Sequence, residues 1–264
     1  MFLIAGCSVN STKNHYILAE KLWTDGNFAA SVAEFERVTA KDPHGKLGLQ
    51  ALFRGGMTET LYLGHQNQAV QKLKSYADLS GDTPLAWEAQ KQIGEIYFSK
   101  TDQYDKAILQ YRSLLKARPD AQEVPEFLFR IGKSHYYLWQ FDDSVKAYQD
   151  ILAKYSSSPW GEKAALELGT TYFTRQEEKK SGGRTHAVGG FEEAIQAYKS
   201  FIKTYPKSDL VAEAKFGIAS CLEEEDQLDA AYLEYEKLKP TYPSPNVIEI
   251  KLTRIRERKA QRSH

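Results

Sequence analysis

The histidines and cysteines are the residues most able to do chemistry, and their spacing limits what that chemistry can be. Imidazole and thiolate groups serve as metal ligands, general bases or nucleophiles when several of them converge. No His-Glu-x-x-His, Gly-x-Ser-x-Gly or Cys-x-x-Cys motif is present in the sequence. The histidines are scattered, at His15, His44, His65, His135, His186 and His264. The sequence therefore predicts no metal site, no cofactor and no enzymatic activity.

The cysteine near the start of the chain indicates a different chemistry, because a thiol can carry a lipid. Ile4, Ala5 and Gly6 precede Cys7, and the polar stretch SVNSTKN follows it. The stretch resembles the lipobox of bacterial lipoproteins, in which small residues fit the signal peptidase and the cysteine receives the anchor. The resemblance implies lipidation of Cys7, with residues 1–11 forming the box and a polar tether.

An export signal requires a basic segment and about seven or more apolar residues before the cleavage site. Only Phe2 to Ile4 lie between Met1 and the box. We therefore expect the true signal to begin upstream of Met1. The alternative is an accidental match in an apolar N-terminus, and the protein would then be cytoplasmic. No window reaches the roughly 18 apolar residues of a membrane-spanning helix, so a lipid anchor is the expected membrane contact.

The composition favours a folded protein without a strong field of either sign. Of the 264 residues, 42% are hydrophobic, which is enough to build a core. The 35 basic residues balance the 35 acidic ones, so no global charge attracts nucleic acid. The two cysteines are too few and too far apart for a disulfide framework. The partners expected are proteins or peptides, and not nucleic acid.

A repeated pattern of small and aromatic residues predicts the elements that would position any site. The order small, turn, aromatic, small, aromatic, proline occurs in about six copies, two of them very clear. One has Gly94, Tyr97, Tyr104, Ala107, Tyr111 and Pro119, with one residue inserted at the turn, and the next has Gly132, His135, Phe141, Ser144 and Tyr148. Weaker copies include one with Met57, Gly64, Ala69 and Leu73. Each copy reads as two helices and a turn.

The residue types have a physical reason to recur. A Gly or Ala on the first helix and an Ala or Ser on the second allow the two helices to approach closely. Aromatic side chains fill the spaces between successive hairpins, and the proline ends the second helix because it lacks an N–H donor. His135 and Cys221 occupy positions inside this pattern, so we expect both to be packed side chains.

This pattern resembles that of the tetratricopeptide-repeat family over nearly all of residues 12–245. The resemblance implies an all-α fold, a right-handed solenoid of about six helix-turn-helix repeats. The segment RQEEKKSGGRTHAVGG at 175–190 is then an insertion, expected to loop out, where a solvated loop is as good an interpretation as a binding segment.

The end of the chain, residues 246–264, predicts an additional helix with two faces. Ile248, Leu252 and Ile255 form an apolar stripe that would cap the last repeat. Another face is basic and could contact an acidic partner or lipid headgroups, unless it is merely solvated. It carries Lys251, Arg254, Arg258 and Arg262. The acidic run Glu223 to Asp226 falls at a helix end, where we expect solvation.

The family resemblance also implies where a partner would bind, because the first helices of the hairpins line the concave side. The inward positions hold a ladder of large apolar residues, Trp23, Leu61, Phe98, Tyr136 and Phe173, with Tyr62 and Tyr137 beside it. The polar residues one turn earlier include Glu20, Glu95 and Lys133. Aromatic residues of this kind form the centres of interfaces, although burial between repeats is an equally good interpretation of any one of them.

The closing phrases KYSSSP, TYPKSD and TYPSP, together with the cysteine box, resemble the BamD-type and Tol-Pal-associated lipoproteins of Gram-negative envelopes. The resemblance implies a non-catalytic scaffold on the periplasmic face of the outer membrane that binds barrel segments and assembly subunits. The alternatives are a periplasmic adaptor associated with a secretin or with motility, and, more distantly, a cytoplasmic adaptor or an enzyme with an unrecognised site.

Overall fold

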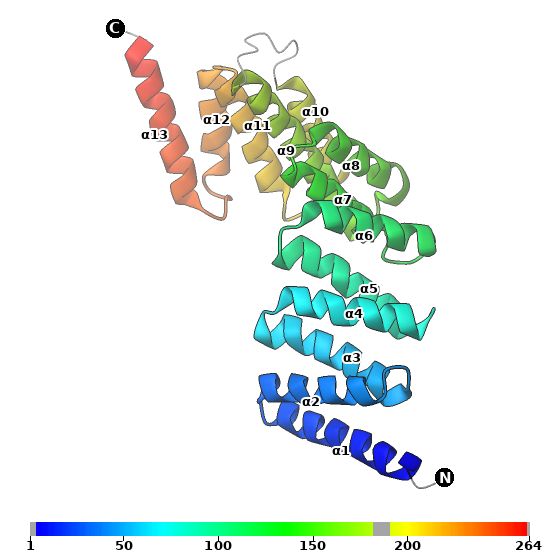
Figure 1. Cartoon of the computed structure of the whole chain (residues 1–264). Helices are drawn as coiled ribbons and strands as arrows, with labels where there is room; N and C mark the ends of the chain where they lie inside the picture. The colour runs from blue at the N-terminus through cyan, green and yellow to red at the C-terminus, as the bar shows by residue number, and fades with distance from the viewer. Residues whose placement is uncertain (1–3, 182–190, 263–264) are drawn as a thin grey trace. The chain divides into compact units, whose positions relative to one another are not determined.

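The structure, a computed structural model, describes the backbone of residues 4–181 and 191–262, and the side chains of 11–176 and 191–262. Within these ranges every regular element is a helix (Figure 1). The helices are α1 (Ile4–Thr24), α2 (Phe28–Lys41), α3 (Lys46–Thr58), η1 (Glu59–Leu63), α4 (Gln66–Ser80), α5 (Pro84–Glu95), η2 (Ile96–Lys100), α6 (Tyr104–Ala117), α7 (Val124–Tyr137), α8 (Phe141–Tyr155), α9 (Pro159–Ser181), α10 (Glu192–Thr204), α11 (Val211–Glu224), α12 (Leu228–Leu238) and α13 (Pro245–Arg262).

The helices pair as predicted into six successive hairpins followed by α13. Within residues 1–119 each helix from α1 to α6 contacts the next one along the chain, and within residues 120–264 the same holds from α7 to α13. The odd-numbered helices α1 to α11 are the first helices of the hairpins, and the even-numbered helices α2 to α12 are the second helices. The all-α solenoid of helix-turn-helix repeats is confirmed.

The chain divides into two compact units, residues 1–119 and 120–264, each containing three hairpins. The pattern alone predicted one continuous solenoid over 12–245. The division falls directly after Pro119, which cannot continue α6 because it lacks an N–H donor. We call residues 1–119 unit 1 and residues 120–264 unit 2, and describe each by itself.

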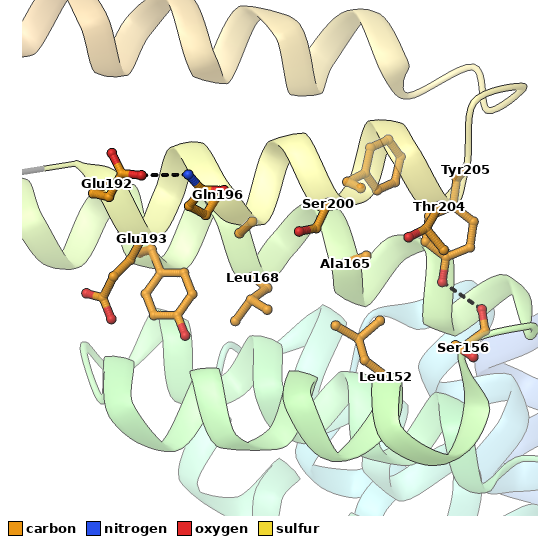
Figure 2. Close-up of a pocket in the computed structure, with 13 residues that line it drawn as sticks. Leu152, Ser156, Ala165, Leu168, Glu192, Glu193, Gln196, Ser200, Thr204 and Tyr205 are labelled. Atoms are coloured by element: carbon orange, nitrogen blue, oxygen red, sulfur yellow. Dashed lines mark hydrogen bonds between the residues drawn. The ribbon is translucent and has the colours of Figure 1, made fainter.

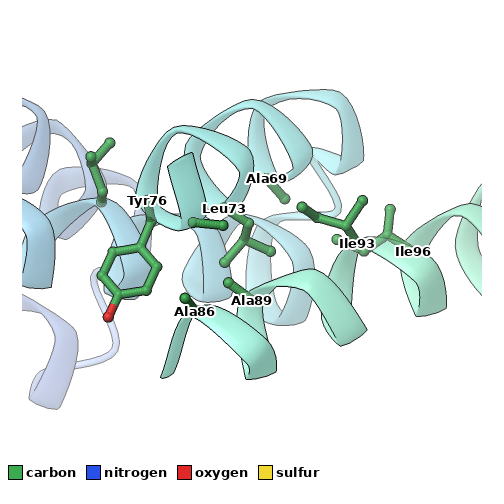
Figure 3. Close-up of a cluster of buried hydrophobic side chains, with 9 residues drawn as sticks. Ala69, Leu73, Tyr76, Ala86, Ala89, Ile93 and Ile96 are labelled. Carbon is green, nitrogen blue, oxygen red and sulfur yellow. The ribbon is translucent and has the colours of Figure 1, made fainter. Parts of the chain in front are cut away.

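The core of unit 1 shows how a hairpin buries its apolar face. Leu73 and Tyr76 of α4 pack against Ala89 and Ile93 of α5 (Figure 3). The start of α5 is fixed locally, because the Thr83 hydroxyl accepts a hydrogen bond from the backbone N–H of Ala86 at 3.1 Å and Pro84 occupies the first helical turn.

The close approach predicted for the small residues of the pattern is confirmed in the hairpins of both units. A Cβ atom on Gly94 would lie 2.9 Å from the ring of Tyr111, and one on Gly132 would lie 2.7 Å from the ring of Tyr148. Real Cβ atoms do not approach ring carbons this closely. The aromatic residue of the second helix therefore lies directly on the glycine of the first.

The second copy of the pattern is shifted by one residue from the sequence-based alignment. The small residue that faces Leu73 is Gly56, where a Cβ would lie 2.9 Å from the leucine, whereas Met57 is only half-buried. One extra residue is accommodated as the π-helical turn η1, and the residue inserted in the third copy is accommodated in the same way by η2. The choice of Met57 was wrong, because counting cannot show where a π turn lies.

Two segments expected to be irregular are helical instead. Helix α9 continues to Ser181, so residues 175–181 are not a loop; RQEEKKS consists mainly of strong helix formers. The remainder of the expected insertion loop, 182–190, lies outside the described residues. Helix α1 begins at Ile4, so the backbone of the expected tether is part of that helix, while the Cys7 side chain lies outside the described residues.

Helix α13 caps unit 2 as expected, but its basic face is used within the chain. Ile248, Leu252 and Ile255 are fully buried in one cluster with α12. Lys251 and Arg254 lie 2.9 and 3.3 Å from the carboxylate of Glu223, which is itself fully buried. Arg258 lies 2.8 Å from Asp226, and Arg262 pairs with the same residue. The expectation of a solvated acidic run was therefore wrong for Glu223.

Candidate functional site

The first-helix face of unit 1 carries an accessible aromatic pocket. Its volume is about 230 Å³, and its walls come from the first helices of two hairpins, α1 and α3, and from η1. The lining residues are Trp23, Phe53, Arg54, Met57, Thr58, Leu61 and Tyr62. The predicted residues Trp23, Leu61 and Tyr62 are thus brought together, and we call this set the unit 1 pocket.

Ring contacts hold the pocket in place. Tyr62 stacks on Phe28 with ring centroids 4.0 Å apart, and Trp23 meets Tyr62 edge to face at 5.8 Å. The guanidinium of Arg54 lies 5.2 Å from the centre of the Trp23 ring and its Nε is 2.8 Å from Glu20. Leu61 remains 60% exposed and Tyr62 48% exposed. The rings are therefore positioned by their neighbours, while a large apolar surface is left in solvent.

Arg54 lines this pocket and Phe28 supports it through Tyr62, but the sequence did not indicate a binding role for either residue. Arg54 lies two residues before the small residue Gly56, a position that the repeat pattern leaves variable. Phe28 is the aromatic residue that follows the first turn, and such residues were expected to fill the space between hairpins. The signal for Arg54 was its charge on an otherwise apolar stretch, LGLQALFRGGM.

The other candidate residues of unit 1, Phe98 and Glu95, lie where the first helix of its third hairpin ends. Phe98 is half-buried and meets the ring of Tyr104 edge to face at 5.9 Å. Glu95, the last residue of α5, accepts a hydrogen bond from Ser99 of η2. Neither residue lines the unit 1 pocket.

The ladder residues of unit 2 are engaged with their own neighbours. The Tyr136 hydroxyl lies 3.0 Å from the Thr174 hydroxyl, and the Phe173 ring packs against Phe191 with centroids 5.0 Å apart. Lys133 lies 2.5 Å from Glu167 of α9. The polar residues that the sequence offered as partner contacts, Glu20 and Lys133, are thus paired within the chain.

Two aromatic side chains of unit 2 do reach the solvent. Tyr137 is 43% exposed, and Trp139, which the sequence did not single out, is 67% exposed at the turn after α7. Trp139 has a backbone φ of 60°, a left-handed conformation that closes the turn. Its ring rests on Phe141 at 5.7 Å.

The residues considered for catalysis are packed as predicted. His135 is 6% exposed, and its Nδ1 lies 2.6 Å from the Gln140 side chain. Cys221 is fully buried. Among the described residues, no three or more His, Cys, Asp or Glu side chains group as a metal site would require. No helix in that part of the chain has the length and apolarity needed to cross a membrane.

A larger pocket lies in unit 2, on the face formed by second helices. It has a volume of about 540 Å³ and lies between α8 and α10, with residues of α9 also lining it. Figure 2 shows Leu152 of α8 and Leu168 of α9 lying between these helices. The repeat pattern indicated a binding surface on the first helices and did not predict this site.

Comparisons with known proteins support the repeat architecture. Tetratricopeptide-repeat family models match residues 187–244, 126–158 and 163–208, all within unit 2. No curated protein matches the sequence. The structure is similar to that of PilW, described as a widely conserved type IV pilus biogenesis factor, with a TM-score of 0.54 and 15% identity over 93% of this chain and 98% of that one.

Two further structures are similar to this chain. One is a fragment of MamA from Desulfovibrio magneticus RS-1, with a TM-score of 0.54 and 17% identity over 76% of this chain and 99% of the other. Another is YrrB, described as having an unusual peptide-binding site, with a TM-score of 0.50 and 13% identity over 76% and 90%. At these identities the likeness concerns the fold. The chain therefore has the fold of a tetratricopeptide-repeat solenoid, and its unit 2 carries the repeats that the family models match.

Proposed function

We propose that the chain is a non-catalytic protein-binding scaffold and that the unit 1 pocket holds a segment of its partner. The observation that carries this proposal is the convergence of Trp23, Leu61 and Tyr62 around one pocket while Leu61 and Tyr62 stay about half in solvent. Such exposed and immobilised apolar groups gain most from being covered by another protein.

The size of the pocket fits one or two side chains of a partner. Its 230 Å³ is below the range of pockets that enclose whole small molecules. Burying one large apolar side chain against Leu61 and Tyr62 would contribute about 1.5–3 kcal/mol. Several such contacts are needed for a stable complex, so the partner is a chain segment that extends beyond the pocket.

We propose further that this scaffold works in the bacterial envelope as an outer-membrane-assembly lipoprotein of the BamD type. The support comes from the cysteine box at Ile4 to Cys7 and from the Tyr-Pro closing phrases. Its partners would then be barrel segments and assembly subunits, and Cys7 would carry the anchor. Transmembrane β-strands alternate apolar and polar residues and are flanked by aromatic girdles, which suits an aromatic pocket.

The anchor is tested by fractionating cells that express the natural gene with its upstream region. The wild-type protein should sediment with membranes, and Cys7→Ser should release it. A soluble wild-type protein would rule out lipidation.

A second candidate function is an adaptor for a secretin or pilus machine. It is favoured by the similarity to the pilus biogenesis factor PilW over 93% of this chain. Affinity capture of the lipidated wild type, with Tyr62→Ala as the matched control, separates the two. Barrel-assembly subunits retained by the wild type and lost by Tyr62→Ala support the leading proposal. Recovery of a secretin without those subunits would replace it with the second.

A further inference from the structure

The pocket on the second-helix face of unit 2 is an apolar groove, which we call the α8–α10 groove. Its floor is formed by Ala165 and Leu168 of α9, and its walls by Leu152 of α8 and by Ala197 and Phe201 of α10. Small residues on both floor and wall allow the backbone of another element to approach closely. The groove follows α10 from Glu192 to Tyr205 (Figure 2), a length of about 20 Å at 1.5 Å per helical residue.

The same place in the repeat is occupied by side chains in unit 1. Aligning Gly94 with Gly169, the small residues of α5 and α9, makes Gln90 equivalent to Ala165. Aligning α6 with α10 at their second small residues, Ala107 and Ala194, makes Gln110 equivalent to Ala197. In unit 1 the amide nitrogen of Gln110 donates to the Gln90 side chain at 2.5 Å and to the Gln90 carbonyl oxygen at 3.0 Å. Two glutamines bridge this groove where unit 2 has two alanines.

A second contact covers the groove of unit 1. The guanidinium of Arg118 lies 4.5 Å from the centre of the Trp87 ring and also pairs with Asp82. In unit 2 the residues equivalent to Arg118 and Trp87 are Tyr205 and Glu162, and these two side chains do not cover the groove. The Tyr205 hydroxyl donates instead to the Ser156 carbonyl oxygen at 2.7 Å. The groove of unit 2 is therefore larger, 540 Å³ against 360 Å³, and more apolar.

One end of the α8–α10 groove is acidic. Glu192 and Glu193 line it, and Asp142 lies close by because Arg175 pairs with both Asp142, at 2.8 Å, and Glu193. Glu192 accepts a hydrogen bond from Gln196 and faces the solvent. Arg175 thus balances part of the charge of Asp142 and Glu193, and Glu192 adds a further carboxylate, so the described lining at this end is negatively charged.

From this geometry we propose that the α8–α10 groove binds an amphipathic helix of a partner protein, with large apolar side chains along one face and a Lys or Arg beside Glu192. A helix satisfies its own backbone hydrogen bonds, whereas an added strand needs the free edge of a sheet, and the groove walls are the sides of helices. Apolar anchors at positions i, i+3 or i+4 and i+7 span roughly 10 Å, so the groove has room for all three. The acidic end selects for a basic residue and against an anionic lipid surface.

The test uses a synthetic, fluorescently labelled and helix-stabilised peptide of about 14 residues, with leucines at i, i+3 and i+7 and lysines at one end. Its affinity for the whole chain is measured by fluorescence anisotropy. The double substitution Ala165→Gln with Ala197→Gln brings the bridge of unit 1 into unit 2. It should weaken binding by at least about tenfold, while Ala153→Gln, an exposed site on α8, should leave the affinity unchanged.

Charge provides an independent readout that does not alter the groove walls. Glu192→Lys should weaken the lysine peptide several-fold, and a peptide with glutamates in place of the lysines should recover the lost affinity. Thermal melting confirms that each variant is folded. Tyr62→Ala should leave the affinity for this peptide unchanged, because Tyr62 lies in the unit 1 pocket. The groove proposal can therefore fail or succeed independently of the proposal for the unit 1 pocket.

Four results would overturn the proposal. The first is equal affinity of the double glutamine variant and the wild type for the peptide, and the second is equal binding of a peptide with serines in place of the leucines. The third is binding of the wild type to anionic lipid vesicles that is lost in the double glutamine variant. The fourth is self-association of the wild type that is lost in the same variant. The last result would identify a second copy of the chain as the occupant.

Discussion

The candidate binding surface lies on the first helices in unit 1 and on the second helices in unit 2. Unit 1 presents an aromatic pocket on its first helices, and its second-helix groove is bridged by Gln90 and Gln110. Unit 2 packs Tyr136 and Phe173 of its first helices against their neighbours and leaves the α8–α10 groove unbridged. In both units the hairpins are held together by the same types of residue, a small one on the first helix and a larger one packed on it from the second. Binding surfaces in this fold are therefore decided at the few positions that the repeat pattern leaves free.

The largest effect is expected from removing a buried carboxylate, for which each unit offers an example. Glu223 of unit 2 is fully buried beside Lys251 at 2.9 Å, and Glu59 of unit 1 is 4% exposed beside Lys72 at 3.0 Å. Glu223→Ala leaves Lys251 without its buried partner and should destabilise unit 2 by about 3 kcal/mol. Urea unfolding measures the loss, with Glu236→Ala, an exposed glutamate on α12, as control.

Hydrogen exchange then tests the division into units. Glu223→Ala should reduce the protection of α11 to α13 and leave α1 to α6 unchanged, and Glu59→Ala should do the reverse. Loss of protection throughout the chain in either variant would contradict the division.

A smaller loss is expected where the glycine of a first helix meets an aromatic ring. Gly132→Ala would bring a Cβ atom to 2.7 Å from the Tyr148 ring, and such overpacking costs about 1–3 kcal/mol. Gly55→Ala is the matched control in unit 1, because its nearest neighbour is the flexible Lys72 side chain at 3.4 Å, and it should be neutral or stabilising. Equal losses in the two variants, measured by thermal melting, would show that the ring contact is not the cause.

Removing the glutamine bridge should make unit 1 resemble unit 2. Gln90→Ala with Gln110→Ala removes the two hydrogen bonds, at a cost of about 1 kcal/mol. The variant should also gain measurable affinity for the leucine peptide described above, through a second site. If the number of leucine peptides bound per chain does not change, Trp87 and Arg118 alone keep the groove of unit 1 closed.

The smallest effect concerns pH. Hydrogen bonding from Arg262, together with the charge of Arg258, lowers the pKa of Asp226. The folded state then favours the charged carboxylate, so this stabilisation is complete above the ordinary aspartate pKa and is lost as the pH falls through the lowered one. The melting temperatures of the wild type and Asp226→Asn should differ slightly at neutral pH and converge in acid. A difference that persists in acid would have another origin.

The fold followed from the sequence because its signal recurs. Small residues such as Gly132 and aromatic ones such as Tyr148 appear at fixed spacing in copy after copy, and each copy predicts the same contact. The π turns escaped prediction because η1 and η2 change the number of residues per turn without changing the residue types. The extension of α9 was missed because a charged, glycine-containing segment was interpreted as a loop throughout its length.

The sites were less predictable, since they depend on which side chains find partners. The sequence placed Trp23, Leu61 and Tyr62 on one face, and the structure brings them around one pocket. It gave Tyr136 and Phe173 the same role, and in the structure both are half-buried, against Thr174 and Phe191. It also offered the basic face of α13 to a partner, because the pairing of Lys251 with Glu223 joins positions far apart in sequence. The α8–α10 groove is defined by two alanines, and alanine carries no signal of function.

The central claim, that the unit 1 pocket holds a partner segment, is tested most directly with a labelled peptide of about ten residues that alternates aromatic and polar side chains, as a transmembrane β-strand does. The wild type should bind it saturably, Tyr62→Ala should bind at least about tenfold more weakly, and Tyr137→Ala, an equally exposed tyrosine of unit 2, should match the wild type. Equal affinities of the wild type and Tyr62→Ala, or an equal loss in Tyr137→Ala, would contradict the claim.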